Sequence, residues 1–194
     1  MNELYPIFLK AHTLKILIVG GGFVGLEKLS FLLKSSPNAT VSLISIDYND
    51  EILQLISKHK LSYKKKAYET SDLDGYTIVI GATNFPAVNE KIYYDAKAAN
   101  TLVNIADNPP FCDFYMGGIV TKGNLKLAIS TNGKSPTMAK RLRQFFEATL
   151  PDNIDTLLKN LHTYRKFLKG NFEYKVDHLN QVTESLITEK TLQQ

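Results

Sequence analysis

The sequence has little cysteine, few histidines and no tryptophan among its 194 residues. Its single cysteine, Cys112, excludes a disulfide within the chain and is typical of a reducing compartment, so we expect a cytoplasmic protein. No apolar run approaches the ~18 residues that a membrane-spanning helix requires. Residues 1–13 lack the basic and apolar regions of a secretion signal. The sequence therefore predicts neither a membrane protein nor a secreted one.

The histidines are too scattered to indicate a metal site, because ions such as zinc need ligands at short, regular spacings. They are His12, His59, His162 and His178. Lys and Arg exceed Asp and Glu by 23 to 19, which gives a formal net charge of +4. We recognise no nucleic-acid-binding module and no aromatic residues interleaved with the basic ones. We therefore predict no resident metal and no nucleic-acid partner, while basic residues lining a cleft would attract an anionic small molecule.

What the sequence does contain is a glycine-rich turn within residues 14–28, LKILIVGGGFVGLEK. The apolar run before the glycines predicts a strand buried on both faces, and a helical pattern follows them. Gly20, Gly22 and Gly25 fit the pattern G-x-G-x-x-G. In a dinucleotide-binding turn these glycines allow a tight turn, close approach of a diphosphate, and close helix packing, respectively. The alternative is a glycine-rich turn that binds nothing. The predicted cofactor-binding residues here are Gly20, Gly21, Gly22, Phe23, Val24 and Gly25.

Strand and helix patterns alternate through the rest of residues 1–113. Further strands are expected at 40–46, 61–68, 76–82 and 101–106, and helices at 24–33, 51–59 and 86–99. This alternation predicts an α/β fold with a Rossmann-type parallel sheet and helices on both faces. Ligands in such sheets bind beyond the carboxyl ends of the strands. Polar residues at these strand ends include Thr83, Asn84, Asn104 and Asp107.

Asp47 follows the second predicted strand, about 20 residues beyond the glycine motif. Dinucleotide-binding folds place a carboxylate at this position to accept hydrogen bonds from the adenosine ribose. An acidic residue there favours NAD over NADP, because it would repel the 2′-phosphate. The residue equally fits a turn that ends a strand, beside residues 48–50. Asn49 is suited to cap the helix that follows.

The pattern changes after residue 113. Residues 115–121 and 125–130 predict an antiparallel hairpin. A polar loop then leads to a helix ending near residue 150, with Ser135 as its N-cap and Pro136 at its first position. Two amphipathic patterns follow, the first capped by Asp152 and the second running through Leu186 and Ile187. Because such helices cannot bury their apolar faces alone, they must pack on each other, on the main domain or on another subunit.

Several separated motifs together resemble the siroheme synthase family. They are YPIFLK, VGGGFVGLEK, GATNFPAVNEKI, LVNIADNPPFCDFYMGGIV and LAISTNGKSPTMAKRLR, in unbroken order over residues 4–150. The resemblance implies a precorrin-2 dehydrogenase that uses NAD to oxidise the tetrapyrrole precorrin-2 to sirohydrochlorin. Some members are also ferrochelatases that insert ferrous iron, and the sequence leaves this activity open.

The resemblance also implies a division of the chain and a partner. It implies a homodimer, because members of the family typically pair through the segment that follows the nucleotide-binding domain. The expected parts are an NAD-binding Rossmann domain at 1–113, a dimerisation segment at 114–150, and a small C-terminal helical domain at 151–194. Many members have alanine where this chain has Gly25, a difference that we expect to be harmless to the fold.

Carried over by position, the family's site implies roles for individual residues. Thr83 and Asn84 would lie on the nicotinamide side, with Asn89 supporting their loop, and Asp47 near the ribose. Asp107 matches the aspartate that the family uses as its acid/base, although it also fits a turn before a proline. The candidates for binding the substrate and its carboxylates are Asn104, Thr131, Asn132, Lys134, Ser135 and Arg141.

Two other functions stay open beside this one. The first is a dehydrogenase of the same fold that acts on another small acid. The second is a regulatory domain that binds NAD without catalysis, for which Asp107 would be dispensable.

Overall fold

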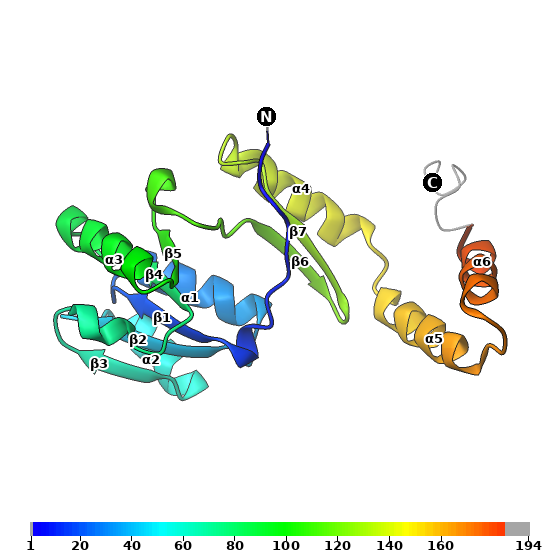
Figure 1. The fold of residues 1–194 in the computed structure, drawn as a ribbon, viewed down its shortest axis with the longest axis horizontal. Helices are drawn as coiled ribbons and strands as arrows, with labels where there is room; N and C mark the ends of the chain where they lie inside the picture. Colours follow the sequence, from blue (N-terminus) through cyan, green and yellow to red (C-terminus); the bar gives the residue numbers. More distant parts are fainter. Residues whose placement is uncertain (1, 185–194) are drawn as a thin grey trace. The chain divides into compact units, whose positions relative to one another are not determined.

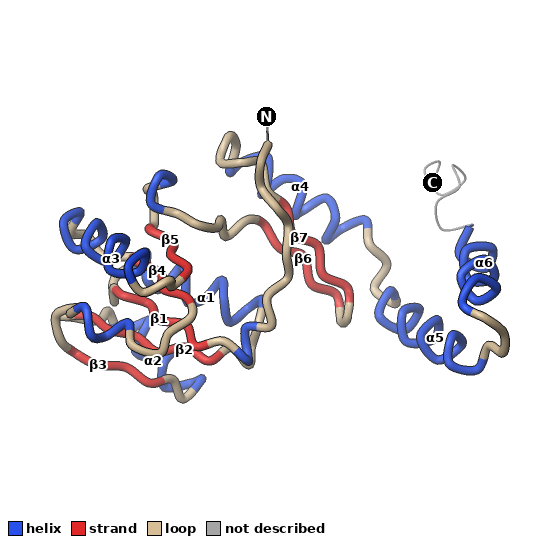
Figure 2. The backbone as a smooth tube through the Cα atoms, in the orientation of Figure 1, coloured by secondary structure: helices blue, strands red, loops and turns tan. Residues whose placement is uncertain are grey.

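The chain forms two compact units in the computed structural model, which describes residues 2–184. Among these residues, the first unit comprises 2–117 and 130–136, and the second comprises 118–129 and 137–184. Residues 2–10 are an exposed loop that leads into the first unit (Figure 2). None of the helices in the described part of the chain is both long and apolar enough to cross a bilayer.

A five-stranded parallel sheet forms the centre of the first unit, in the order β3-β2-β1-β4-β5 (Figure 1). The central strands β1 and β4 read as continuous apolar runs because helices cover both of their faces. Strand β3 is exposed along its length and forms one edge. The parallel α/β fold predicted from the sequence is confirmed. The strands are β1 (Lys15–Val19), β2 (Thr40–Ser45), β3 (Ser62–Lys65), β4 (Ile78–Gly81) and β5 (Leu102–Ile105).

Two apolar clusters cover the two faces of this sheet. In β1, Ile16 and Ile18 pack with helices α1 (Phe23–Ser35) and α2 (Asp50–His59) on one face. Leu17 and Val19 point to the other face, where they pack with α3 (Pro86–Ala98) and the short 3₁₀ helix η2 (Thr70–Leu73). Successive residues of a strand alternate between faces, so one buried run supplies both clusters.

Helix α1 lies almost directly on the glycine turn. A Cβ atom added at Gly25 would lie closer than 3.0 Å to the carbonyl oxygen of Gly20, a distance that real Cβ atoms do not show. Gly20 itself has φ of +128°, which favours glycine, and its added Cβ would meet the backbone of Ala82. The close helix packing predicted for Gly25 is therefore confirmed. Because the neighbouring atom is backbone, glycine fits this position closely, in agreement with our expectation that glycine here is harmless to the fold.

The second unit consists of a hairpin and helices. The predicted antiparallel hairpin and the helix start at Pro136 are confirmed, and Val120 of the hairpin is fully buried. The sequence predicted that Asp152 caps α5, and this prediction is wrong. The helix begins at Ile154 with Asn153 at its N-cap, and the Asp152 carboxylate pairs with Lys122 at 3.0 Å. The elements are β6 (Gly118–Lys122), β7 (Leu125–Ile129), α4 (Pro136–Thr149), α5 (Ile154–Phe167) and α6 (Phe172–Thr183).

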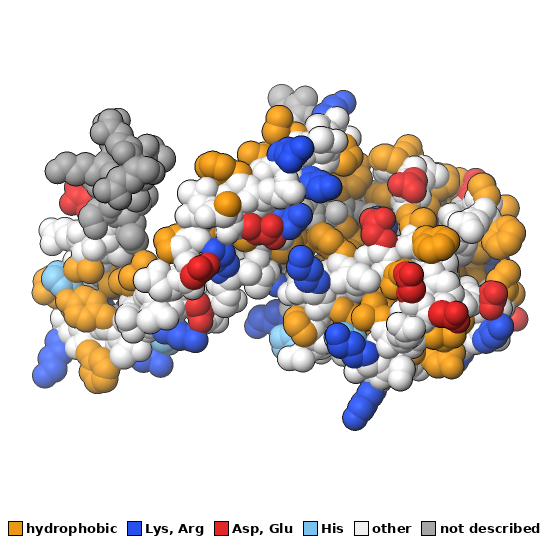
Figure 3. Space-filling view, turned by 180° about the vertical axis from the view of Figure 1, so that it is seen from behind, with side chains coloured by type: hydrophobic (Ala, Val, Ile, Leu, Met, Phe, Trp, Pro, Cys, Tyr) orange, Lys and Arg blue, Asp and Glu red, His pale blue; other side chains and the backbone are white. Residues whose placement is uncertain are grey.

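Helices α5 and α6 contain no buried residue. Hydrophobic side chains are exposed on them (Figure 3), including Phe167 at 78% and Phe172 at 72%. The continuation of the amphipathic pattern through Leu186 and Ile187 lies outside the described residues. The division of the chain into a Rossmann domain, a dimerisation segment and a helical domain stays a prediction.

We expect Gly25→Ala to lower the free energy of unfolding by about 1–3 kcal/mol, because the new methyl group must push α1 away from the turn. Urea denaturation measures this change. Gly22→Ala is the matched control, since a Cβ at Gly22 meets no atom within 4 Å. Equal stability of the two variants would contradict the close packing.

Asp155 connects α5 to the hairpin turn. Its carboxylate accepts hydrogen bonds from the backbone and side-chain nitrogens of Asn124, both at 2.7 Å, and it pairs with Lys159 at 2.6 Å. The hydrogen bond from Lys159 is the largest cause that lowers the pKa of Asp155 to about 2. This folded-state pKa lies below that of a free aspartate. The contribution of Asp155 to the free energy of unfolding is therefore complete above about pH 4 and is lost as the pH falls toward 2.

Asp155→Ala should therefore speed hydrogen exchange at the Asn124 amide by about tenfold at neutral pH, because that amide loses its acceptor. Amide exchange followed by NMR measures the effect. Asp152→Ala removes a neighbouring carboxylate that is paired with Lys122, and it should leave the Asn124 amide unchanged. If both variants behaved like the wild type, Asp155 would not hold the turn.

Candidate cofactor site

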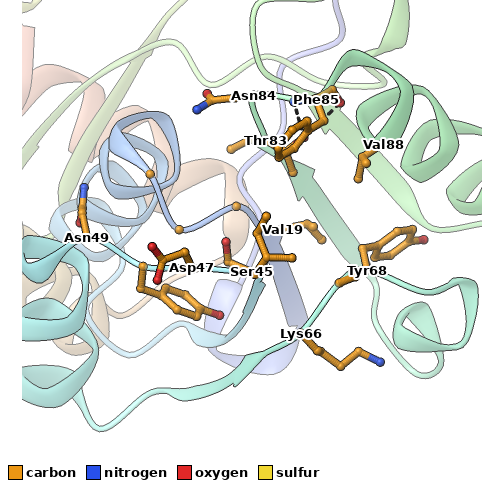
Figure 4. Close-up of a pocket in the computed structure, with 17 residues that line it drawn as sticks. Val19, Ser45, Asp47, Asn49, Lys66, Tyr68, Thr83, Asn84, Phe85 and Val88 are labelled. Atoms are coloured by element: carbon orange, nitrogen blue, oxygen red, sulfur yellow. Dashed lines mark hydrogen bonds between the residues drawn. The ribbon is translucent and has the colours of Figure 1, made fainter.

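A cleft of about 650 Å³ opens at the carboxyl ends of the strands (Figure 4). Its walls are the glycine turn after β1 and the residues that follow β2, β3 and β4. The chain runs from β1 outward to β2 and β3, then crosses back to β4 on the other side of β1. The cleft therefore lies where the strand order reverses, the usual place for a ligand in an open α/β sheet.

The glycine turn presents bare backbone to this cleft. Gly20 and Gly21 are packed against protein atoms, whereas a Cβ at Gly22 would project into open space. Gly22 is the N-cap of α1, no side chain caps this helix, and its first turn has no acidic residue. The first N–H groups of α1 are thus left for an anionic ligand. Phe23 is exposed and Val24 half-buried at the start of the helix.

Asn49 was predicted only as a helix cap, and this is confirmed, because its Oδ1 accepts a hydrogen bond from the Ile52 amide at 2.8 Å. Its backbone N–H also donates to the Gly21 carbonyl at 3.0 Å, which braces this loop against the glycine turn. The side chain lines the cleft, and its Nδ2 is buried with no partner among the described residues. A buried donor left unpaired costs about 1–3 kcal/mol, which an acceptor entering the cleft would offset. These features fit a dinucleotide diphosphate beside the glycine turn.

Asp47 lies in the cleft wall after β2, where the sequence placed it. Its carboxylate is exposed and forms an ion pair with Lys65 at 3.0 Å. The hydrogen bond from the Lys65 ammonium keeps the pKa of Asp47 below its usual value, so the group is ionised at neutral pH. An ionised, exposed carboxylate at this position is able to accept hydrogen bonds from ribose hydroxyls. The sequence reading missed Lys65, which belongs to the neighbouring strand.

The loop after β4 is held by Asn89 of α3. Its Oδ1 accepts hydrogen bonds from the Thr83 backbone N–H at 3.2 Å and from the Thr83 hydroxyl at 2.7 Å, and its Nδ2 donates to the Thr83 carbonyl at 2.9 Å. The support that we expected from Asn89 is confirmed. Thr83 and the exposed Asn84 line the opposite wall of the cleft from Asp47 (Figure 4).

Asp107 lines a second cavity of about 340 Å³, together with Asn89, Glu90 and Phe111. It follows β5 in a left-handed conformation with φ of +58°, which aspartate tolerates better than most residues. Its side chain is exposed. Asn89 thus both clamps the cleft loop and lines the Asp107 cavity, so the start of α3 connects the two spaces.

Asn104 is buried rather than directed at a cavity. Its Nδ2 donates to the Phe114 carbonyl at 2.8 Å and lies 3.4 Å from the sulfur of Cys112. The Cys112 thiol donates in turn to the Ile105 carbonyl at 3.2 Å, and burial raises its pKa. These contacts favour a structural role for Asn104 over the substrate contact suggested by the sequence.

The remaining predicted substrate residues belong to the two units. In the first unit, the Thr131 hydroxyl accepts from the Ser135 amide at 3.2 Å, which closes a compact turn containing Asn132 and the exposed Lys134. In the second unit, the exposed Arg141 of α4 donates to Gln144 at 3.2 Å. No group of three or more His, Cys, Asp or Glu side chains suited to a metal occurs within residues 2–184.

The fold, the bare glycine turn and the cleft at the reversal of strand order define a dinucleotide-binding protein of Rossmann type. A family model described as putative NAD(P)-binding matches residues 7–118, and one described as sirohaem biosynthesis protein central matches residues 122–149. Because the first match spans more than half of the chain, the protein belongs to this putative NAD(P)-binding family.

Curated relatives agree with this assignment. A siroheme synthase from Psychrobacter sp. (strain PRwf-1) is 32% identical over 98% of this chain and 42% of its own length. Another, from Pseudoalteromonas translucida (strain TAC 125), is 33% identical over 89% of this chain and 36% of its own length. The chain thus spans about two-fifths of the length of these relatives. The resemblance to siroheme synthases is confirmed.

A solved structure named SirC, precorrin-2 dehydrogenase, has the same fold. It superimposes with a TM-score of 0.72 at 24% sequence identity, covering 97% of this chain and 92% of that one.

Gly22→Ala should weaken NAD binding by at least about tenfold, because the methyl group occupies the space where the diphosphate approaches the backbone. Isothermal titration calorimetry measures the affinity. Adenosine has no phosphate, and its affinity should be the same for the variant and the wild type. An unchanged NAD affinity would show that the diphosphate does not bind at Gly22.

Proposed function

We propose that this chain catalyses the NAD-dependent oxidation of precorrin-2 to sirohydrochlorin in siroheme biosynthesis. The observation that carries the proposal is the connection through Asn89 between the cofactor cleft and the cavity of Asp107. A hydride acceptor in the cleft and a carboxylate in the cavity are the two parts that a dehydrogenation needs. The siroheme synthase relatives and the SirC fold support the choice of substrate.

Individual residues hold the cofactor in this proposal. The N–H groups at Gly22 and the start of α1 bind the diphosphate, and Asp47 accepts from the adenosine ribose. Asn89 keeps Thr83 and Asn84 in place on the nicotinamide side. Bound NAD supplies the site with a hydride acceptor.

Asp107 takes the proton that must leave the substrate when a hydride is removed. Its carboxylate is exposed in the cavity and lies directly after β5, on the edge of the sheet that carries the cleft. General-base catalysis of this kind contributes about 10²–10⁴-fold to the rate. The left-handed backbone at Asp107 suits Asn as well as Asp, so the charge can be tested without changing the turn.

The carboxylates of the tetrapyrrole require donors and positive charge. We assign them to the turn that contains Thr131, Asn132, Lys134 and Ser135, and to Arg141, which is able to hold a carboxylate with two parallel hydrogen bonds. Asn104 is left out because its amide is bound within the protein.

We also propose that the chain acts as a homodimer through residues 114–150. Helix α4 of this segment exposes the apolar side chains of Leu142 and Phe145, which are in keeping with a partner surface. Insertion of ferrous iron as a second reaction, and a place in the cytoplasm, stay predictions from the sequence.

Asp107→Asn should lower kcat for NADH formation from precorrin-2 by about 10²–10⁴-fold, with the NAD affinity unchanged, because only the proton acceptor is lost. NADH absorbance and the sirohydrochlorin spectrum, followed together, measure the reaction. Glu90→Gln removes another carboxylate from the same cavity and should keep most of the activity.

Three results would count against this proposal. Equal losses in the two variants would mean that Asp107 is not the specific base. A wild-type protein that binds NAD but forms no NADH with precorrin-2 would favour the regulatory alternative. Turnover of another small acid in its place would favour a different dehydrogenase.

A further inference from the structure

Lys65 stands beside the carboxylate that is expected to meet the adenosine ribose. The parallel register pairs Ser45 of β2 with Lys65 of β3, and the Lys66 N–H donates to the Ser45 carbonyl at 2.9 Å. The ends of these two strands are therefore held together. The Lys65 ammonium consequently lies 3.0 Å from the carboxylate of Asp47, a residue that lines the cleft.

The other two lysines of this run have different surroundings. The Lys66 ammonium is held by Glu69 at 2.9 Å and by the buried carboxylate of Asp72 at 3.1 Å. Lys64 precedes Lys65 in β3, and neighbouring residues of a strand point to opposite faces of the sheet. Lys64 accordingly lines a separate cavity, together with Asp72 and other residues. Of the three, Lys65 is the one whose ammonium is paired with Asp47.

The Asp47–Lys65 pair is exposed, with 81% of the Asp47 side chain and 66% of the Lys65 side chain accessible. Exposed ion pairs contribute little to stability, so this pair can separate at small cost. A lone carboxylate would repel the 2′-phosphate of NADP. Here the lysine offsets that charge, and its flexible ammonium is able to turn onto a phosphate.

We propose that the cleft accepts 2′-phosphorylated dinucleotides as well as NAD, and that Lys65 binds the 2′-phosphate. This inference rests on the cofactor site proposed above. With NAD, Lys65 stays on Asp47 and Asp47 accepts from the ribose hydroxyls. With NADP, Lys65 leaves Asp47 for the phosphate. Lys65 is thus a specificity-determining residue that reduces the preference for NAD set by Asp47.

The test compares Lys65→Ala with Lys64→Ala by calorimetric titration of the purified protein with NAD and with NADP. Both variants lose one positive charge from the same strand, so their long-range electrostatic effects match. Lys65→Ala should raise the Kd for NADP by about tenfold, the effect of one charge-assisted contact, and leave the Kd for NAD within about twofold. Lys64→Ala should change neither by more than about twofold.

A second pair of variants separates direct contact from simple neutralisation of Asp47. Asp47→Asn should strengthen NADP binding, and adding Lys65→Ala to it should still weaken NADP by about tenfold if the ammonium touches the phosphate. Loss of the Lys65 effect in the Asp47→Asn background would overturn the contact.

Other outcomes are equally decisive. Equal effects of Lys64→Ala and Lys65→Ala on NADP would overturn the inference, as would a wild-type protein that binds NAD but not NADP. A wild-type protein that binds neither nucleotide would instead overturn the proposed cofactor site itself.

Discussion

The close approach of Gly25 to the Gly20 carbonyl is the constraint on which the site depends. Without a side chain at Gly25, α1 starts directly over the turn, and its N-cap residue Gly22 lines the cleft. The same turn is braced from the other side, where the Asn49 N–H bonds the Gly21 carbonyl. Helix, turn and the loop after β2 are therefore one rigid piece, and Asp47 lies within that piece.

The second wall of the cleft is rigid for a different reason. Three hydrogen bonds from one side chain, Asn89, fix both the backbone and the hydroxyl of Thr83. Because α3 also lines the Asp107 cavity, a single helix start positions both the loop proposed to meet the nicotinamide and the space next to the proposed base. Hydride transfer and proton removal must happen on one substrate, so coupling these positions is a physical requirement of the proposed reaction.

The sequence was sufficient for the fold because buried parallel strands leave a plain signal. The run at residues 16–19 feeds both apolar clusters, and Asp47, Thr83 and Asp107 follow strands whose carboxyl ends share one edge. Contacts that need the strand order were not predictable in this way. Lys65 meets Asp47 only because β3 pairs with β2. Asn104 is held inside the protein because the chain after β5 brings the Phe114 carbonyl to its side-chain amide, a contact that the strand pattern does not predict.

Burial separates two ion pairs that look alike in sequence. Lys66 pairs with Asp72, whose side chain is 5% exposed, and Asp72 also accepts from the Glu69 N–H at 2.9 Å. Breaking that pair would leave a buried charge, so it acts as part of the fold. Lys65 and Asp47 are paired at a similar distance in solvent, where separation costs little. Adjacent lysines of one strand end are thus suited to opposite tasks, one to hold the structure and the other to respond to a ligand.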